Sequence, residues 1–408
     1  MSGDELAALV DGLRWDRRRD PYRGRREYSQ AARHVAETCE RLIGSGAEAR
    51  VVPVLRKAVD RMTRALMYMD DSSGIVGDDL HEMMRLYAQA CAESPPKPAG
   101  LARWLVELAC DGPGWPRIVL RDFAPALDER GLAEVARLVD TRAQAAEPQS
   151  WTATFAVRDL REQLAEVSGD VDRYVAVLAE HLDSAVQYER ITLALRDVDR
   201  RPEAIAWARR GLADKPGWPH SERLRDRLVD MLLADGHTDA AVQARRDEFE
   251  RHPTLAAFRE LAATTAMVGA DDPAPWALPI LEQRVARQSV YVGELIDVLL
   301  ELGRDTEAWR VGQDNRERLG DRLWLRLLER RQGRHPADVL APYQDMVEHV
   351  LNSSDKHRYR RAIALLPALR DAYTAAGDPT AFPAYLAELR ARHGRRPTFV
   401  KALDAAGL

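Results

Sequence analysis

The sequence predicts an all-α fold, namely an α-solenoid of helix pairs preceded by an N-terminal helical bundle. Ala, Leu, Arg and Glu, which all favour helices, dominate the composition. Aromatic residues make up only 6% of the chain, and the alternation of apolar and polar residues that marks strands is nearly absent. A chain of 408 residues is too long for one compact core. We therefore expect two or three domains or an extended repeat array.

In the N-terminal region, residues 1–148, helices are expected wherever apolar residues recur on one face at steps of three and four. A short first helix leads into an Arg-rich loop, because Pro21 and Gly24 interrupt helical structure. The helices that follow are predicted at about residues 28–42, 51–69, 80–90, 98–110, 117–128 and 131–146. Pro148, between Glu147 and Trp151, marks the predicted boundary with a repeat region at residues 149–408.

The repeat region is predicted from internal similarity rather than from single helices. A shift of 37 residues aligns six positions, of which five keep their character: Tyr188, Ile191, Leu195, Ala204, Leu212 and Pro216 with Arg225, Leu228, Leu232, Ala241, Phe249 and Pro253. A turn between two helices recurs at Arg201-Pro202, Gly236-His237, Gly269-Ala270, Gly303-Arg304, Gly333-Arg334 and Gly377-Asp378. Most of these intervals lie near the period of about 34 residues that is typical of helix-pair solenoids. In such an array each pair buries its apolar face only against the next pair.

The segment Ala204–Pro216 resembles the second helix of a tetratricopeptide repeat. Ala204, Ala208 and Gly211 stand at the small-residue positions of that family, and Pro216 stands at its terminal proline. However, Thr192 replaces the usual glycine and Arg245 replaces an aromatic residue. The repeats are therefore degenerate, and the peptide-binding residues of the family are not carried over to this chain.

A second resemblance is to the helical region of bacterial SWIM zinc-finger proteins, which lies C-terminal to their zinc finger. It rests on the segments Ala65–Gly74, Leu101–Leu108, His335–Tyr343 and the tail as far as Tyr385–Leu389. The zinc finger itself needs Cys-x-Cys followed by Cys-x-His, whereas the three cysteines of this chain are widely separated. The resemblance therefore implies a bacterial helical protein without that zinc module, and it implies no enzymatic role.

Charge and hydropathy favour a cytoplasmic protein. The chain has 60 basic and 65 acidic residues and a pI near 6.1, which argues against a dedicated nucleic-acid binder. No stretch reaches the roughly 18 apolar residues of a membrane span, and the acidic N-terminus has no apolar signal core. Cys39, Cys91 and Cys110 lie in apolar helical patterns, which is typical of buried free thiols in a reducing compartment.

The acidic loop Asp70–Asp79 is the main candidate for metal binding, since divalent cations prefer oxygen ligands on a turn. An EF-hand reading fails, because neither Asp70 nor Asp71 as the first residue places both Gly at position six and Glu at position twelve. The alternative interpretation is a helix stop followed by Asp and Ser caps. His81-Glu82 begins a zinc-protease motif, but Arg85 replaces its second histidine. We expect no cofactor and no enzyme, with a metal-assisted enzyme at this loop as an alternative.

Arginine clusters are the candidate binding residues for a partner. We expect the partner to be another protein or a peptide segment, held on the concave face of the solenoid through Arg donors and apolar pockets. A nucleic-acid accessory protein is the alternative, because guanidinium groups also bind phosphates. A third interpretation is that these arginines pair with the chain's own acidic residues. The candidates are Arg17, Arg18, Arg19, Arg25, Arg26, Arg358, Arg360 and Arg361.

Overall fold

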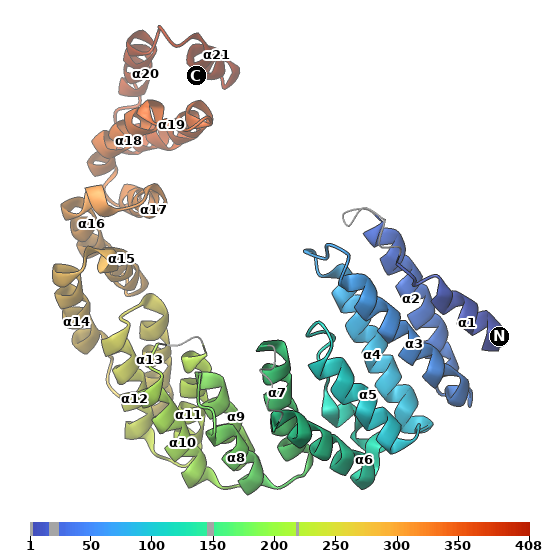
Figure 1. Cartoon of the computed structure of the whole chain (residues 1–408). Helices are drawn as coiled ribbons and strands as arrows, with labels where there is room; N and C mark the ends of the chain where they lie inside the picture. The colour runs from blue at the N-terminus through green and yellow to red at the C-terminus, as the bar shows by residue number, and fades with distance from the viewer. Residues whose placement is uncertain (1–2, 16–23, 145–150, 218–219) are drawn as a thin grey trace. The chain divides into compact units, whose positions relative to one another are not determined.

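The computed structural model describes residues 3–15, 24–144, 151–217 and 220–408, and these residues form helices and turns without any strand (Figure 1). The predicted all-α fold is confirmed. The chain divides into two compact units, Met1–Arg227 and Leu228–Leu408. Residues 145–150, around the predicted boundary, lie outside the described residues. The division into residues 1–148 and 149–408 therefore stays a prediction.

The first unit contains ten complete described helices and the start of an eleventh. They are α1 (Gly3–Asp11), α2 (Arg25–Leu42), α3 (Glu48–Leu66), α4 (Ile75–Glu93), α5 (Pro98–Cys110), α6 (Leu120–Ala143), α7 (Trp151–Val167), α8 (Val171–Ala179), α9 (Ala185–Asp197), α10 (Arg201–Asp214) and α11 (Ser221–Ala234).

The N-terminal helices of this unit pack in two layers. Helix α2 contacts α4, which contacts α6, whereas α1 contacts α3, and α5 contacts α7. One apolar core runs between the layers, from Leu6 on α1 to Leu160 on α7. Helix α6 is kinked at Asp128, whose φ is 51°, and the Asp128 carboxylate accepts hydrogen bonds from the next backbone amides, at Arg130 and Gly131. The two short helices predicted here therefore exist as the two arms of α6.

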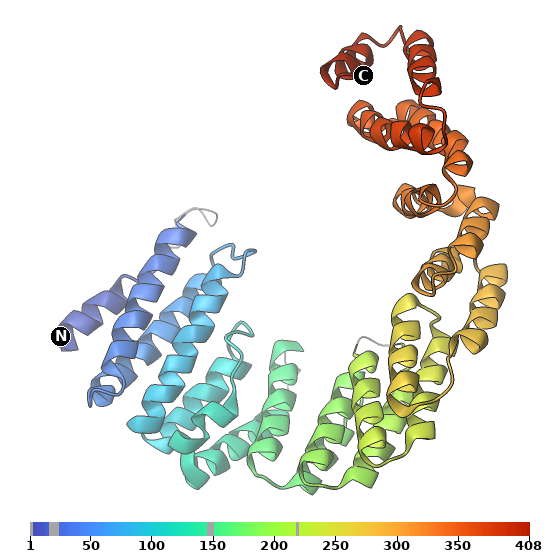
Figure 2. The same ribbon diagram turned by 180° about the vertical axis from the view of Figure 1, so that it is seen from behind.

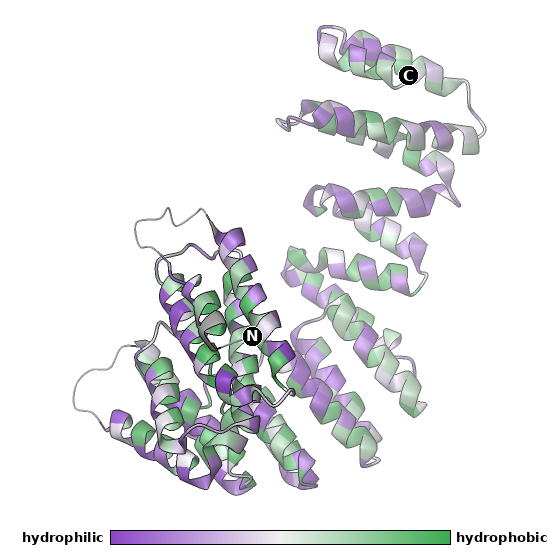
Figure 3. Cartoon of the chain, turned by 90° about the vertical axis from the view of Figure 1, so that its right-hand side faces the viewer, coloured by the Kyte–Doolittle hydropathy of each residue, from purple (hydrophilic) through white to green (hydrophobic). Residues whose placement is uncertain are grey.

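The second unit continues from α11 with further helix pairs (Figure 1, and from behind in Figure 2). Its helices are α12 (Thr238–Arg251), α13 (Leu255–Val268), α14 (Ala274–Arg287), α15 (Val292–Glu301), α16 (Asp305–Asp314), α17 (Asp321–Gln332), α18 (Leu340–Asn352), α19 (Arg358–Ala375), α20 (Ala381–Arg392) and α21 (Pro397–Ala405). A second continuous apolar core extends from Phe249 to Leu403. Green and purple residues alternate along its helices in Figure 3, as expected when each helix buries one face.

The turns within the helix pairs share one geometry. A residue one or two positions after the end of the first helix has a positive φ, namely Asp199, Gly236, Gly269, Gly303 or Gly377. At each of them the next amide donates to the carbonyl five residues earlier, for example from Arg304 to Leu299 at 2.8 Å. This is the Schellman ending of a helix. The predicted turn at Gly333 differs, because Gly333 has a φ of −63° and a short 3₁₀ helix, Pro336–Val339, follows it.

The small residues Ala204, Ala208 and Gly211 of α10 are buried between neighbouring helices. Ala204 and Ala208 on α10 have no exposed surface. A Cβ added to Gly211 would lie 2.6 Å from side-chain atoms of both Tyr188 on α9 and Leu224 on α11. Because that separation is far below van der Waals contact, α10 reaches its neighbours only with glycine at this position. The α-solenoid packing of helix pairs is thus visible in individual contacts.

Most large apolar side chains of the described helices are buried, whereas Trp151, Phe155 and Met267 are exposed. None of these helices is long and apolar enough to cross a membrane. Cys39, Cys91 and Cys110 are buried free thiols, and burial raises the pKa of both Cys39 and Cys91 to about 11.

Candidate partner-binding groove

A groove of about 900 Å³ in the second unit is lined by the first helices of three successive pairs, α15, α17 and α19. Most of its wall comes from the exposed face of α17. Among the described residues that line it there is no histidine, cysteine or hydroxyl side chain. The lining residues are Asp297, Gly320, Asp321, Arg322, Leu323, Leu325, Arg326, Glu329 and Arg361.

Helix α17 presents this face because its other face is anchored in the core. Trp324 and Leu327 are buried, and the Trp324 ring stacks on Trp309 of α16 with centroids 5.2 Å apart. A Cβ on Gly312 of α16 would lie 2.5 Å from Leu327, so the two helices are in close contact. Helical spacing of three, four and seven residues then turns one polar stripe toward the groove. That stripe is Arg322, Leu325, Arg326 and Glu329.

Ion pairs join the helices that line the groove. Arg326 on α17 pairs with Asp297 on α15. Arg361 on α19 donates to Asp321 on α17, with Nη2 2.9 Å from Oδ2. Arg361 also donates through Nη1 to Asp355, at 2.9 Å. Each first helix is therefore linked to the next one by a guanidinium group and a carboxylate.

The same arrangement recurs at other first helices within each unit. In the second unit, Arg259 on α13 forms a bidentate pair with Glu301 on α15, with N–O distances of 2.9 and 2.6 Å. The hydrogen bonds from Arg259 lower the pKa of the Glu301 carboxyl. In the first unit, Arg190 on α9 pairs with Glu162 on α7. We call these contacts between consecutive first helices the inter-repeat ion pairs.

Two charged residues in the groove do not take part in inter-repeat ion pairs. Arg322 and Glu329 are exposed, and neither has an ion-pair partner within the part of the chain that the structure describes. Seven residues of helix separate them, which places their Cα atoms about 10 Å apart along α17. The half-buried Leu325 lies between them on the same stripe. The groove thus offers a free cation, an apolar contact and a free carboxylate in a line.

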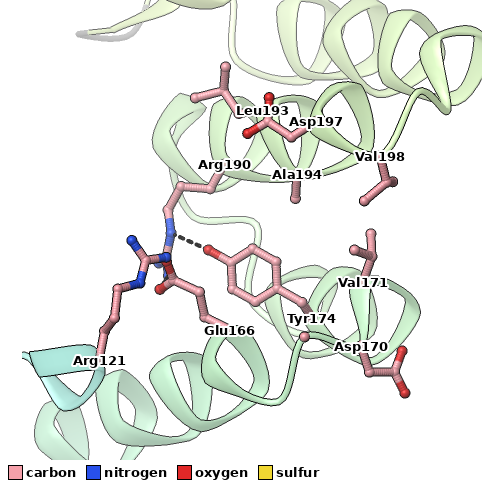
Figure 4. A pocket seen from close by; sticks show the side chains of 11 residues that line it. Arg121, Glu166, Asp170, Val171, Tyr174, Arg190, Leu193, Ala194, Asp197 and Val198 are labelled. Carbon is pink, nitrogen blue, oxygen red and sulfur yellow. Dashed lines mark hydrogen bonds and ion pairs between the residues drawn. The ribbon is translucent and has the colours of Figure 1, made fainter. Parts of the chain in front are cut away.

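A smaller cavity, of about 360 Å³, lies in the first unit beside α8 and α9. Figure 4 shows polar groups at one end, where the Nε atom of Arg190 donates to the Tyr174 hydroxyl at 3.0 Å. Arg121 and Arg190 both contact the Glu166 carboxylate there. Val171 and Val198 lie at the other end (Figure 4). Because both arginines already contact a glutamate, an anionic ligand would have to displace Glu166.

The N-terminal residues predicted to bind a partner fall into two groups. Arg17, Arg18 and Arg19 lie outside the described residues. Arg25 is half-buried and donates to the Asp70 carbonyl oxygen at 2.8 Å, whereas Arg26 is exposed. Arg25 therefore joins the start of α2 to the loop after α3.

The C-terminal candidates lie at the start of α19. Arg358 donates to the Ser353 carbonyl at 2.9 Å, and its guanidinium lies 5.1 Å from the centroid of the Tyr359 ring. Arg360 is exposed. Of the predicted residues that the structure describes, Arg361 alone lines the groove, and it does so as one half of an inter-repeat ion pair.

The carboxylates of the acidic loop form local hydrogen bonds. Asp71 accepts from the amides of Val76 and Gly77, at 3.2 and 2.8 Å, and thereby caps the start of α4. Asp79 is buried and accepts from Arg33 at 2.9 Å and from Ser29. Among the described residues, no group of three or more His, Cys, Asp or Glu side chains is placed to hold a metal ion. These contacts favour the capping interpretation of the loop.

Sequence reasoning missed Asp297, Arg322, Arg326 and Glu329, which make up most of the groove's charge. Their signal is weak, because charged residues at a spacing of three to seven occur on many exposed helix faces. The groove arises from three helices that are distant in sequence. A motif search within one helix cannot find it.

Comparisons with known proteins define a family but no activity. Residues 22–263 match the model of a family described as "Family of unknown function (DUF6880)". The groove lies C-terminal to that match. Among solved structures, yeast Tom70 is similar with 10% identity and a TM-score of 0.23, over 93% of this chain and 91% of the other. A circular tandem repeat protein with novel repeat topology shares 16% identity with a TM-score of 0.20, over 100% and 98% of the two chains. No curated protein matches.

Proposed function

Starting from the premise that this chain belongs to DUF6880, a family of unknown function, we propose that it is a non-enzymatic scaffold that binds a peptide segment of a partner protein. The observation that carries this proposal is the groove on α15, α17 and α19, in which Arg322 and Glu329 have no ion-pair partner among the described residues. An array of helix pairs offers such grooves because its first helices lie next to one another.

The chemistry of the groove specifies the peptide. An acidic side chain pairs with Arg322, an apolar side chain packs on Leu325, and a basic side chain pairs with Glu329. The two charged groups of α17 are about 10 Å apart, which equals about three residues of an extended peptide. The proposed ligand is therefore an extended segment with an acidic residue, an apolar residue and a basic residue, the two charged ones three positions apart.

The inter-repeat ion pairs support a binding role for the groove. Arg326 and Arg361 hold α15, α17 and α19 in register through Asp297 and Asp321. A preformed groove loses less conformational freedom when a ligand binds, which improves affinity. Arg326 and Arg361 thus fix the positions of the three helices, and Arg322 and Glu329 determine which ligand binds.

The alternatives have less support from the described contacts. Arg25, Arg358 and Arg361 donate to carbonyl or carboxylate oxygens of the chain itself, which leaves fewer donors for a nucleic-acid backbone. The resemblance to SWIM zinc-finger proteins stays a prediction. If it holds, a bacterial protein with that finger is a suitable partner to test first. Binding in the cytoplasm is likewise part of this proposal.

A synthetic peptide array tests the proposal. It displays the acidic–apolar–basic pattern at spacings of two, three and four residues, each in both charge orders. We expect the full-length chain to bind peptides with a spacing of three and one charge order, with micromolar affinity in fluorescence anisotropy. R322E is expected to weaken that binding at least tenfold, because it places like charges together.

A matched control is R310E on the second helix α16. Arg310 is exposed and does not line the groove, so this variant has the same charge change and is expected to bind like the unaltered chain. Equal affinity for all charge orders and spacings, or equal loss in R322E and R310E, would contradict the proposal.

A further inference from the structure

A second cavity in the first unit has the composition of an anion site. It measures about 410 Å³ and lies between the end of α1 and helix α3. That volume falls in the range of about 300–1,000 Å³ that is usual for small-molecule sites. The lining residues are Leu13, Arg14, Trp15, Arg61, Arg64, Ala65 and Tyr68.

The cations of this pocket outnumber the carboxylates that neutralise them. Asp11 is the carboxylate that pairs with Arg14 at 3.9 Å, with Lys57 at 3.2 Å and with Arg61 at 2.6 Å. Arg64 is exposed and has no ion pair within the described ranges. Three basic side chains thus share one carboxylate, and Arg64 adds a fourth positive charge beside them. In the sequence, the chain continues from Trp15 into the Arg-rich segment.

Two arginines of the pocket, Arg61 and Arg64, differ in how much of their side chains is exposed. The Arg61 side chain lines the pocket, is only 10% exposed, and is held in place by the Asp11 carboxylate and the Val10 carbonyl oxygen, so a phosphate would compete with these two acceptors. Arg64, one turn further along α3, is exposed at the rim. Guanidinium groups bind phosphate oxygens with two parallel hydrogen bonds, which gives arginine its preference for this ligand.

Two aromatic rings line the same pocket. Trp15 is half-buried and packs edge to face on Tyr28, with centroids 5.7 Å apart. Tyr68 is 40% exposed. Aromatic rings beside arginines are the usual combination where proteins bind a nucleobase by stacking and its phosphate by charge.

From this combination we propose that the pocket binds a nucleoside phosphate, with its phosphate against Arg61 and Arg64 and its base against Tyr68 or Trp15. The ligand is either a free nucleotide or a nucleotide of a single-stranded nucleic acid. This site is independent of the peptide groove, because the two share no residue and lie in different units.

Isothermal titration calorimetry of the full chain at low salt tests the pocket with ADP, pyrophosphate and an oligothymidylate. We expect ADP to bind. R64E should weaken the binding of ADP at least tenfold. Y68A should weaken the binding of ADP severalfold and leave the affinity for pyrophosphate unchanged. R130E is the matched control, since Arg130 is exposed on α6 and does not line the pocket. Its ADP affinity should equal that of the unaltered chain.

The two sources of the ligand differ in these titrations. Tighter binding of the oligothymidylate than of ADP, with the same loss in R64E, assigns the site to single-stranded nucleic acid. Tighter binding of ADP assigns it to a free nucleotide. No ADP binding at millimolar concentration, equal losses in R64E and R130E, or an unchanged ADP affinity in Y68A would each overturn the proposal.

Discussion

Arg361 on α19 donates to Asp321 on α17 across 40 positions of sequence, with 2.9 Å between Nη2 and Oδ2. This contact links the first helices of neighbouring pairs, and equivalent contacts join α13 to α15 and α15 to α17. Arginines of this chain therefore link the first helices of successive helix pairs.

The Arg361–Asp321 pair is expected to contribute modestly to stability. Both side chains are partly exposed, at 45% and 32%, and exposed pairs contribute about 0.2–1 kcal/mol. A double-mutant cycle with R361M and D321N, measured by urea unfolding at low salt, should give a coupling energy in that range. The coupling should shrink in molar NaCl. A coupling energy of zero at low salt would show that the contact does not stabilise the stack.

The Arg259–Glu301 pair predicts a dependence of stability on pH. Arg259 holds the pKa of Glu301 in the folded chain below its usual value of 4.5, so the pair stabilises the fold above that value. As pH falls through the lowered pKa, the folded chain takes up the proton and this contribution disappears. E301Q should therefore be less stable than the unaltered chain at neutral pH, and this difference should shrink as the pH is lowered below 4.5. A stability difference that does not change between these pH values would be the contrary result.

Replacement of Gly211 by alanine should destabilise the fold. The added methyl would lie 2.6 Å from atoms of Tyr188 and Leu224, and overpacking of this kind costs about 1–3 kcal/mol. Gly100 in α5 is the matched control, because a Cβ there has nothing within 4 Å. G100A should stabilise the chain by about 0.5–1 kcal/mol through helix propensity. If G211A were as stable as G100A in urea unfolding, the close helix approach would be refuted.

The shared turn geometry makes a separate prediction. Gly303 has a φ of 70° and open space around its Cβ position, so G303A meets only backbone strain, which costs about 1–2 kcal/mol. Asp199 occupies the equivalent place with a φ of 60°, and D199G should therefore stabilise the fold by a fraction of that amount. Thermal unfolding of both variants measures these shifts. A stable G303A would mean that the left-handed turn is not required.

Local features of the fold were predictable from the sequence, because they depend on neighbouring residues. The turns at Gly236, Gly269 and Gly303 could be predicted because glycine favours the positive φ that ends a helix. The small residues of α10 could be predicted from their helical spacing alone. Gly333 shows the limit of this reasoning, since the short 3₁₀ helix that follows it gives the turn a different geometry.

The groove was less predictable, because it depends on which helices become neighbours. Arg361 was noticed as a member of a basic cluster, yet Asp355 and Asp321 neutralise it, and Asp321 is distant in sequence. Arg322 and Glu329 carry no local signal that separates them from other exposed charges. They stand out only after the pairs formed by Arg326 and Arg361 are known.

Charge reversal on both molecules tests the peptide groove most directly. The variant R322E/E329R should lose binding to the selected peptide and should regain it, within about threefold, when the acidic and basic residues of the peptide are exchanged. Rescue by the exchanged peptide would place the ligand along α17 in one orientation. If the double variant bound both peptides as the unaltered chain does, or neither of them while remaining folded, the groove would not be the binding site.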